Sequence, residues 1–239
     1  MPYAQDLPLR LRSVLATIYL LFNEGYNSTD HRDHIREDLI EEALRLGDML
    51  ARHPGIARPE VHALMALMLF HAARSEARVD GNGAIVLLHD QDRGKWDGEL
   101  IALADRHLHQ AAQGTVVSAY HVEAGIASVH AHAPSFGGTD FTTIVELYDR
   151  LLTLTPTPVV RFNRAIAIGQ AQGAAAGLKA LDAVDGLEHS HLYHAARGDL
   201  LRNLSRKDDA QAAYSRALML VRSPLEMDLL ERKRRGLDR

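Results

Sequence analysis

The chain has 239 residues, of which 46 % are apolar and only 5 % aromatic, and this composition favours helices over sheets. Its 27 basic and 31 acidic side chains give a net charge of -4, whereas a free-standing nucleic-acid-binding protein usually carries a basic excess. The absence of cysteine excludes disulfides and thiolate chemistry. The most apolar run, residues 63–70, is far shorter than the roughly 20 residues of a membrane span, so we expect a cytoplasmic protein without a membrane partner.

Apolar residues at helical spacing predict three helices in the first part of the chain. The first lies between Pro8 and Gly25, the second follows residue 35 and ends before Pro54, and the third begins after Pro59. The third is apolar on nearly every side up to Phe70, which predicts a position at the centre of the core.

A break follows these helices. Residues 80–83 (DGNG) are a strong tight-turn signal and residues 84–88 are β-prone, so we expect a small β-hairpin over residues 77–88. Helices resume at about 97–110, 116–132, 141–154, 159–172, 174–184, 191–204, 208–221 and 225–235. The sequence thus predicts an all-α fold with an N-terminal part, residues 1–139, and a repetitive part, residues 140–239, in one continuous domain.

The last hundred residues show an internal repeat. Small and large residues follow the spacing of a tetratricopeptide hairpin, whose period is about 34 residues, at Gly198, Leu201, Ala210, Tyr214 and Ala217. About 33 positions earlier the same pattern occurs at Ala165, Ile168, Gly177, Leu181 and Val184. Small residues are needed where two antiparallel helices approach closely, so we predict a tetratricopeptide-like solenoid of helical hairpins. An irregular helical bundle is the alternative.

Motifs for chemistry are scarce. The chain has 14 histidines, including three His-x-His pairs, but side chains two positions apart on a helix point in different directions, so we expect no metal site. Asp90 and Asp92 could present two carboxylates to Mg²⁺, yet His89, Arg93 and Lys95 are at hand to neutralise them. An ion-paired loop pinned by Trp96 is the simpler interpretation. No nucleophile elbow, phosphate loop or dinucleotide fingerprint is present, so we expect no cofactor and no enzymatic activity.

Several segments in a fixed order carry a family resemblance. They are residues 19–26 (YLLFNEGY), 67–74 (LMLFHAAR), 87–97 (LLHDQDRGKWD) and 120–135 (YHVEAGIASVHAHAPS). The chain resembles the tetratricopeptide-like C-terminal extension of a group of bacterial extracytoplasmic-function (ECF) RNA polymerase sigma factors. The resemblance implies regulation of transcription initiation through contacts with the sigma-factor core domains, the RNA polymerase core or another protein. Promoter DNA would be bound only by domains that this sequence does not show, and we expect the chain to be a piece of such a factor rather than a stand-alone relative.

Polar residues that packing does not explain are the candidates for contact. They are Asn23, Glu24, Tyr26, His71, Arg74, Asp90, Asp92, Arg93 and Trp96. In the first hypothesis all of them except His71 and Arg74 form a protein-docking surface of a regulatory module. In a second, the pocket of a small-ligand sensor or an enzyme is lined by Asn23, Glu24, His71, Arg74 and residues 90–93. A third treats the chain as a general tetratricopeptide-like scaffold. For Glu24 we expect a helix cap or an ion pair with an arginine such as Arg74.

Overall fold

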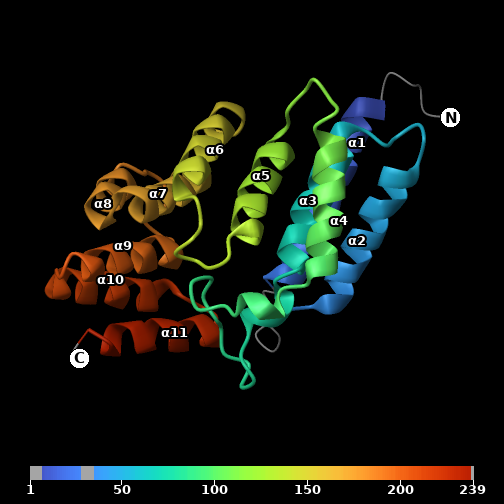
Figure 1. Ribbon diagram of the computed structural model, residues 1–239. Coiled ribbons are helices and arrows are strands. Elements are labelled where there is room, and N and C mark those ends of the chain that lie inside the picture. The colour runs from blue at the N-terminus through green and yellow to red at the C-terminus, as the bar shows by residue number, and fades with distance from the viewer. Residues whose placement is uncertain (1–6, 28–34, 238–239) are drawn as a thin grey trace. The chain divides into compact units, whose positions relative to one another are not determined.

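The computed structural model describes residues 7–27 and 35–237, and this part of the chain is built from helices and turns (Figure 1). The α-helices are α1 (Leu7–Tyr26), α2 (Glu37–Arg52), α3 (Pro59–Ala72), α4 (Gly98–Ala111), α5 (Ala119–His132), α6 (Phe141–Leu154), α7 (Pro158–Gln172), α8 (Ala174–Asp182), α9 (His191–Asn203), α10 (Lys207–Leu220) and α11 (Pro224–Arg235). Two 3₁₀-helices, η2 (Ser75–Arg78) and η3 (Arg93–Lys95), lie between α3 and α4. The predicted all-α fold is confirmed.

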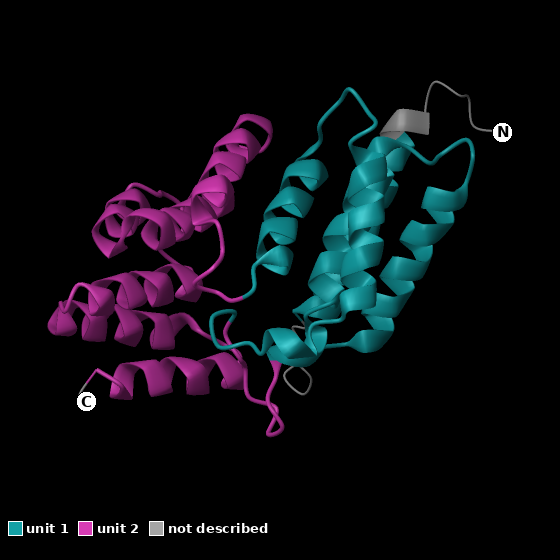
Figure 2. Cartoon of the chain, in the orientation of Figure 1, with its two compact units in different colours: residues 1–78, 88–134 teal, residues 79–87, 135–239 magenta. Residues whose placement is uncertain are grey.

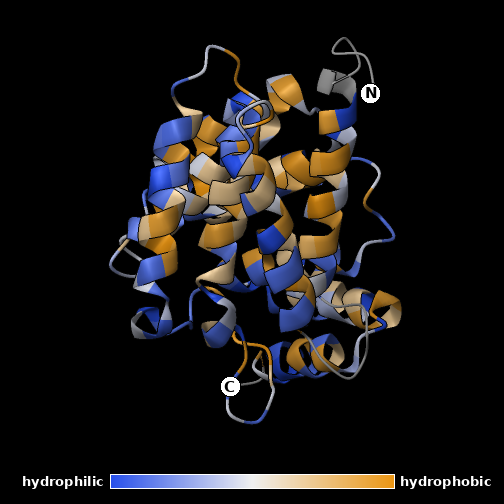
Figure 3. Ribbon diagram, turned by 90° about the vertical axis from the view of Figure 1, so that its right-hand side faces the viewer, coloured by the Kyte–Doolittle hydropathy of each residue, from blue (hydrophilic) through white to orange (hydrophobic). Residues whose placement is uncertain are grey.

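The chain divides into two compact units (Figure 2). Unit 1 comprises residues 1–78 and 88–134, and unit 2 comprises residues 79–87 and 135–239. Hydrophobic and hydrophilic positions alternate along most helices, as expected of helices with one face in a core (Figure 3). None of the helices in the described ranges is long and apolar enough to span a bilayer.

Helix α3 forms the centre of unit 1, as predicted. Almost all of its residues from Val61 to Phe70 are buried, and it packs against α1, α2, α4 and α5. Gly25, near the end of α1, lies at a close approach of the first two helices. A Cβ at this position would lie 2.9 Å from the Arg36 carbonyl oxygen and 2.9 Å from the Ile40 nitrogen. Glycine therefore lets the last turn of α1 pass the start of α2.

The turn predicted at residues 80–83 is present, but the expected hairpin is reduced to a single antiparallel bridge between Val79 and Ile85. The residues before Val79 account for the difference, because Ser75–Arg78 form the 3₁₀-helix η2 and are not extended. The Asp80 carboxylate accepts hydrogen bonds from the backbone N–H groups of Asn82, at 2.8 Å, and Ala84, at 2.9 Å. The Asp80 side chain thus stabilises the turn of residues 80–83.

Helices α7 to α10 of unit 2 form two consecutive antiparallel hairpins, α7 with α8 and α9 with α10, and α11 packs on α10. At the α7–α8 crossing a Cβ on Gly177 would lie 2.5 Å from the Gly169 Cα. At the α9–α10 crossing a Cβ on Gly198 would lie 2.6 Å from Cε1 of Tyr214, which is fully buried. Small residues are therefore needed at both crossings, and the predicted helical-repeat solenoid is confirmed.

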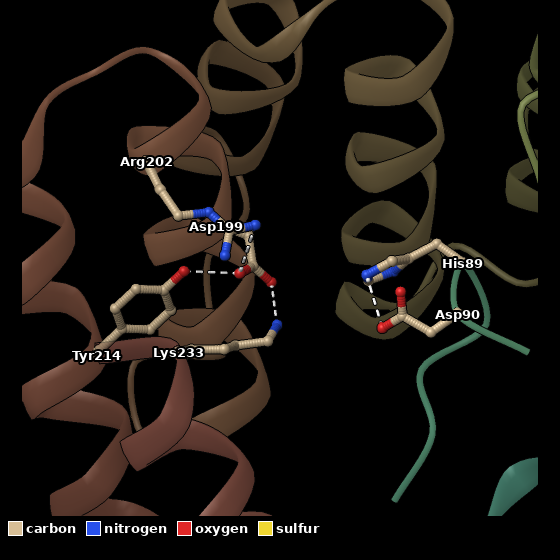
Figure 4. Close-up of polar contacts among 6 residues, drawn as sticks. All are labelled: His89, Asp90, Asp199, Arg202, Tyr214 and Lys233. Atoms are coloured by element: carbon tan, nitrogen blue, oxygen red, sulfur yellow. Dashed lines mark hydrogen bonds and ion pairs between the residues drawn. The ribbon is translucent and has the colours of Figure 1, made fainter. Parts of the chain in front are cut away.

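A polar contact joins the last three helices. The Tyr214 hydroxyl donates to Asp199 Oδ1 at 2.7 Å, and Lys233 Nζ donates to Asp199 Oδ2 at 2.5 Å (Figure 4). Asp199 on α9 thus accepts from both α10 and α11. Because the two donors satisfy different oxygens of one carboxylate, this network fixes α11 against the α9–α10 hairpin.

Candidate functional site

The end of α1 places Tyr26 in a buried aromatic and basic environment in unit 1. Its ring is stacked on Phe22, with centroids 5.6 Å apart, and lies 5.2 Å from the ring of His71 on α3. The guanidinium of Arg78 lies 3.7 Å from the centre of the Tyr26 ring. Arg78 also donates to the Tyr26 carbonyl oxygen and, at 2.5 Å, to Asn27 Oδ1. Arg78 thus holds the C-terminal end of α1 by a cation–π contact and two hydrogen bonds.

Residues 89–96 have an outer and an inner side. His89, Asp90, Asp92 and Lys95 are exposed, whereas Gln91 and Trp96 are each only 8 % exposed. Asp92 caps η3, since its Oδ1 accepts from the Gly94 N–H at 2.8 Å. The segment is therefore a rigid surface turn.

Arg93 anchors the inner side of this turn. Its Nη1 donates to the carbonyl oxygens of His130 and Ala133 at the end of α5, the latter at 3.2 Å. Its guanidinium lies 4.1 Å from the centre of the Trp96 ring, and that of Arg74 lies 5.2 Å from the same ring. Arg74 Nε also donates to Gln91 Oε1 at 3.4 Å. We call Tyr26, His71, Arg74, Arg78, Arg93 and Trp96 the basic cluster.

Two histidines beside these arginines are held neutral. Burial, reinforced by Arg74 and Arg78, lowers the pKa of His71 to about 3. Burial, reinforced by Arg74 and Arg93, lowers the pKa of His130 to about 4. Within the described ranges no carboxylate forms an ion pair with Arg74 or Arg93. Among the described residues, the guanidiniums of Arg74 and Arg93 thus carry positive charge that no ion-paired carboxylate offsets.

The structure brings five of the predicted site residues together in the basic cluster, namely Tyr26, His71, Arg74, Arg93 and Trp96. Asp90 and Asp92 lie on the outer side of the turn, where Asp90 pairs with His89 at 3.2 Å (Figure 4). The expected pairing with His89 is confirmed for Asp90, whereas the expected neutralisation by Arg93 is wrong, because Arg93 turns inward to the carbonyl oxygens of α5. Trp96 pins the segment as predicted.

Asn23 and Glu24 occupy partly buried positions on the last turns of α1. Asn23 lies within hydrogen-bonding reach of the Tyr19 hydroxyl. The suggested ion pair between Glu24 and Arg74 does not form among the described residues, because Arg74 is directed at Gln91 and Trp96 instead.

Sequence reasoning missed Glu123 on α5. Burial raises the pKa of this carboxyl to about 7, and the nearby Tyr19 hydroxyl opposes the shift by hydrogen bonding. The ring of Tyr19 also meets that of Tyr120 edge-on at 5.6 Å. The sequence did contain a signal for this buried carboxyl, because Glu123 is the single acidic residue among the mostly apolar residues of α5.

The histidines of the His-x-His pairs contact other residues and do not converge on one point. His107 faces His62, with the two Nδ1 atoms 3.0 Å apart, whereas His132 pairs with Asp105 at 3.1 Å. In the residues that the structure describes, no three or more His, Asp or Glu side chains are arranged to hold a metal ion.

Comparison with known proteins yields one family and one relative. Residues 10–112 match the model of a family of unknown function, DUF6596. Residues 10–112 include the end of α1 and residues 89–96, and both of these segments contribute side chains to the basic cluster. The chain is also 39 % identical over 227 residues to an uncharacterized protein of Rhizobium meliloti (strain 1021), covering 94 % of this chain and 53 % of that protein. The chain thus spans about half the length of this relative. No solved structure matches.

Proposed function

We propose that the chain is a regulatory domain of an ECF-type RNA polymerase sigma factor and that it acts by protein–protein contact. Its partners would be the promoter-binding domains of the same factor and the RNA polymerase core. Promoter DNA would be bound by those other domains, in keeping with the net charge of -4 on this chain. We propose no catalytic role and no cofactor for it.

The observation that carries this proposal is the two-sided turn of residues 89–96. Gln91 and Trp96 are buried, and Arg93 is tied to two carbonyl oxygens of α5, so the turn has a fixed conformation. His89, Asp90 and Lys95 are exposed on this rigid frame. A surface whose backbone is held in place loses little backbone conformational entropy on binding, which suits it to recognise a protein partner.

Two further observations support the proposal. The relative from Rhizobium meliloti is about twice as long as this chain, which leaves room for further domains in such a protein. The hairpins of unit 2 belong to a class of architecture that commonly presents extended surfaces to peptides and helices.

Charge reversal on the turn tests the proposal. Asp90→Arg, introduced into the full-length protein that contains this chain, should lower sigma-dependent transcription in vitro several-fold without changing the melting temperature. The matched control is Glu41→Arg, which reverses the charge of another exposed acid, on α2. Arg93 is unsuitable for this purpose because its removal would release the turn from α5. Equal transcription by both variants and by the unaltered protein would remove the turn from the mechanism.

A second function, small-ligand binding, is favoured by a specific observation. His71 and Arg74 from one segment and Arg93 from another meet in one partly buried cluster.

A further inference from the structure

Several polar atoms of the basic cluster are buried without a hydrogen-bond partner among the described residues. They are Tyr26 Oη, His71 Nδ1, Trp96 Nε1, and Nε and Nη2 of Arg93. Tyr26 and Trp96 are themselves only 7 % and 8 % exposed. Burying one such group without a partner is costly, and native proteins rarely concentrate several at one place.

These atoms belong to residues that contact one another. Tyr26 lies against His71, and Arg93 lies against Trp96. Arg74 joins the two halves, since it lies over Trp96 and acts electrostatically on both His71 and Arg93. The unsatisfied groups therefore belong to one connected set of residues.

The charge of the site decides what it can bind. The guanidiniums of Arg74 and Arg93 both lie over the indole ring of Trp96, and their like charges repel each other. Water could accept hydrogen bonds from Arg93, Tyr26 and Trp96, but it could not offset this charge. An anion with several acceptor oxygens could do both, because the forked N–H groups of arginine match a carboxylate or a phosphate group.

We infer that the basic cluster binds an oxyanion, a carboxylate or phosphate group, between Arg74, Arg93 and the buried donors of Tyr26 and Trp96. The anion is either a free small molecule or an acidic side chain of a partner protein. This binding property is independent of the proposed role in transcription. It can be measured on the isolated chain.

Calorimetric titration and thermal unfolding test the inference. The probes are sodium phosphate, sodium succinate and the peptide triglutamate, each compared with sodium chloride at equal ionic strength. At least one probe should bind saturably and raise the melting temperature. Arg74→Gln should weaken that binding about tenfold or more, the usual worth of a charge-assisted hydrogen bond. The control is Arg106→Gln, which removes the charge of an exposed arginine on α4 and should leave the affinity unchanged.

The two sources of the anion are distinguished by the order of affinities. Triglutamate binding tenfold or more tightly than succinate and phosphate would identify a protein side chain as the ligand, and the reverse order would identify a free small anion.

A second measurement does not depend on a variant. A bound anion should raise the pKa of the neighbouring His71 and His130 imidazoles, which nuclear magnetic resonance of the unaltered chain would detect. If Arg74→Gln does not fold, the change in the pKa of these two imidazoles on adding the anion tests the inference instead. Absence of saturable binding by all three probes would overturn the inference, as would an equal loss of affinity in Arg74→Gln and Arg106→Gln. Neither result depends on transcription, so failure here is separable from failure of the proposed function.

Discussion

Replacing Gly177 by alanine should destabilise unit 2, although alanine is the better helix former. A Cβ at Gly177 would lie 2.5 Å from the Gly169 Cα and 3.1 Å from Leu200 Cδ2, whereas ordinary contact begins at 3.4 Å. Helices α7 and α8 would therefore have to separate by roughly 1 Å, because a backbone atom cannot rotate away. Overpacking of this kind costs about 1–3 kcal/mol, and alanine returns at most about 1 kcal/mol of helix propensity. With the full return of helix propensity, the expected net loss is up to about 2 kcal/mol.

Gly169, which faces Gly177 between α7 and α8, supplies the control. A Cβ at Gly169 would meet only the flexible tip of Leu200, at 2.9 Å, and the Gly177 Cα at 3.5 Å. Gly169→Ala should therefore cost less than Gly177→Ala. Urea unfolding followed by circular dichroism gives the free energies, and amide hydrogen exchange in α7 and α8 locates the effect. Equal stability of the two variants, or a stabilised Gly177→Ala, would refute the close approach of these helices.

Three further predictions concern buried ionisable groups. Burial raises the pKa of Glu123 to about 7, so its contribution to stability is present below its ordinary value near 4.5 and is lost as the pH rises through 7. Glu123→Gln should therefore stabilise the protein by about 1–3 kcal/mol at pH 8 and by little at pH 4, as urea midpoints at both pH values would show. Burial and the facing His62 lower the pKa of His107 to about 4, so stability is retained above pH 6.5 and lost as the pH falls toward 4. His107→Gln should flatten that part of the pH–stability curve, and an unchanged slope would contradict the assignment. Lys233→Met leaves Asp199 without its partner on α11 and should cost about 1–3 kcal/mol, detected as faster amide exchange in residues 224–235. Exchange at the unaltered rate would show that α11 is held by apolar packing alone.

The helices were predictable because their signals are local. Apolar spacing, Pro59 and the glycines near helix ends placed most helices within a few residues of their observed bounds. The predicted start at residue 116 is too early, because Ser118 and His121 form a capping box that fixes the beginning of α5. The repeat spacing also placed Gly177 and Gly198 correctly at helix crossings. It did not reveal Gly169, which is the true partner of Gly177.

The site was less predictable because its contacts are long-range. The sequence identified Tyr26, His71, Arg74, Arg93 and Trp96 as polar or aromatic residues that needed an explanation. It could not show that Arg93 donates to carbonyl oxygens some 40 positions away on α5, since any backbone carbonyl looks alike in a sequence. A charged side chain in a loop was read as a partner for neighbouring acids, whereas tertiary structure turns it inward.

The position of Trp96 gives the chain a spectroscopic reporter of its own. It is the single tryptophan among 239 residues, and it lies under two guanidiniums in the basic cluster. Indole emission depends on the polarity and charge around the ring, so any event that moves Arg74 or Arg93 should alter its wavelength or intensity. Fluorescence of the unlabelled protein would thus follow this one place in the molecule, without a background from other indoles.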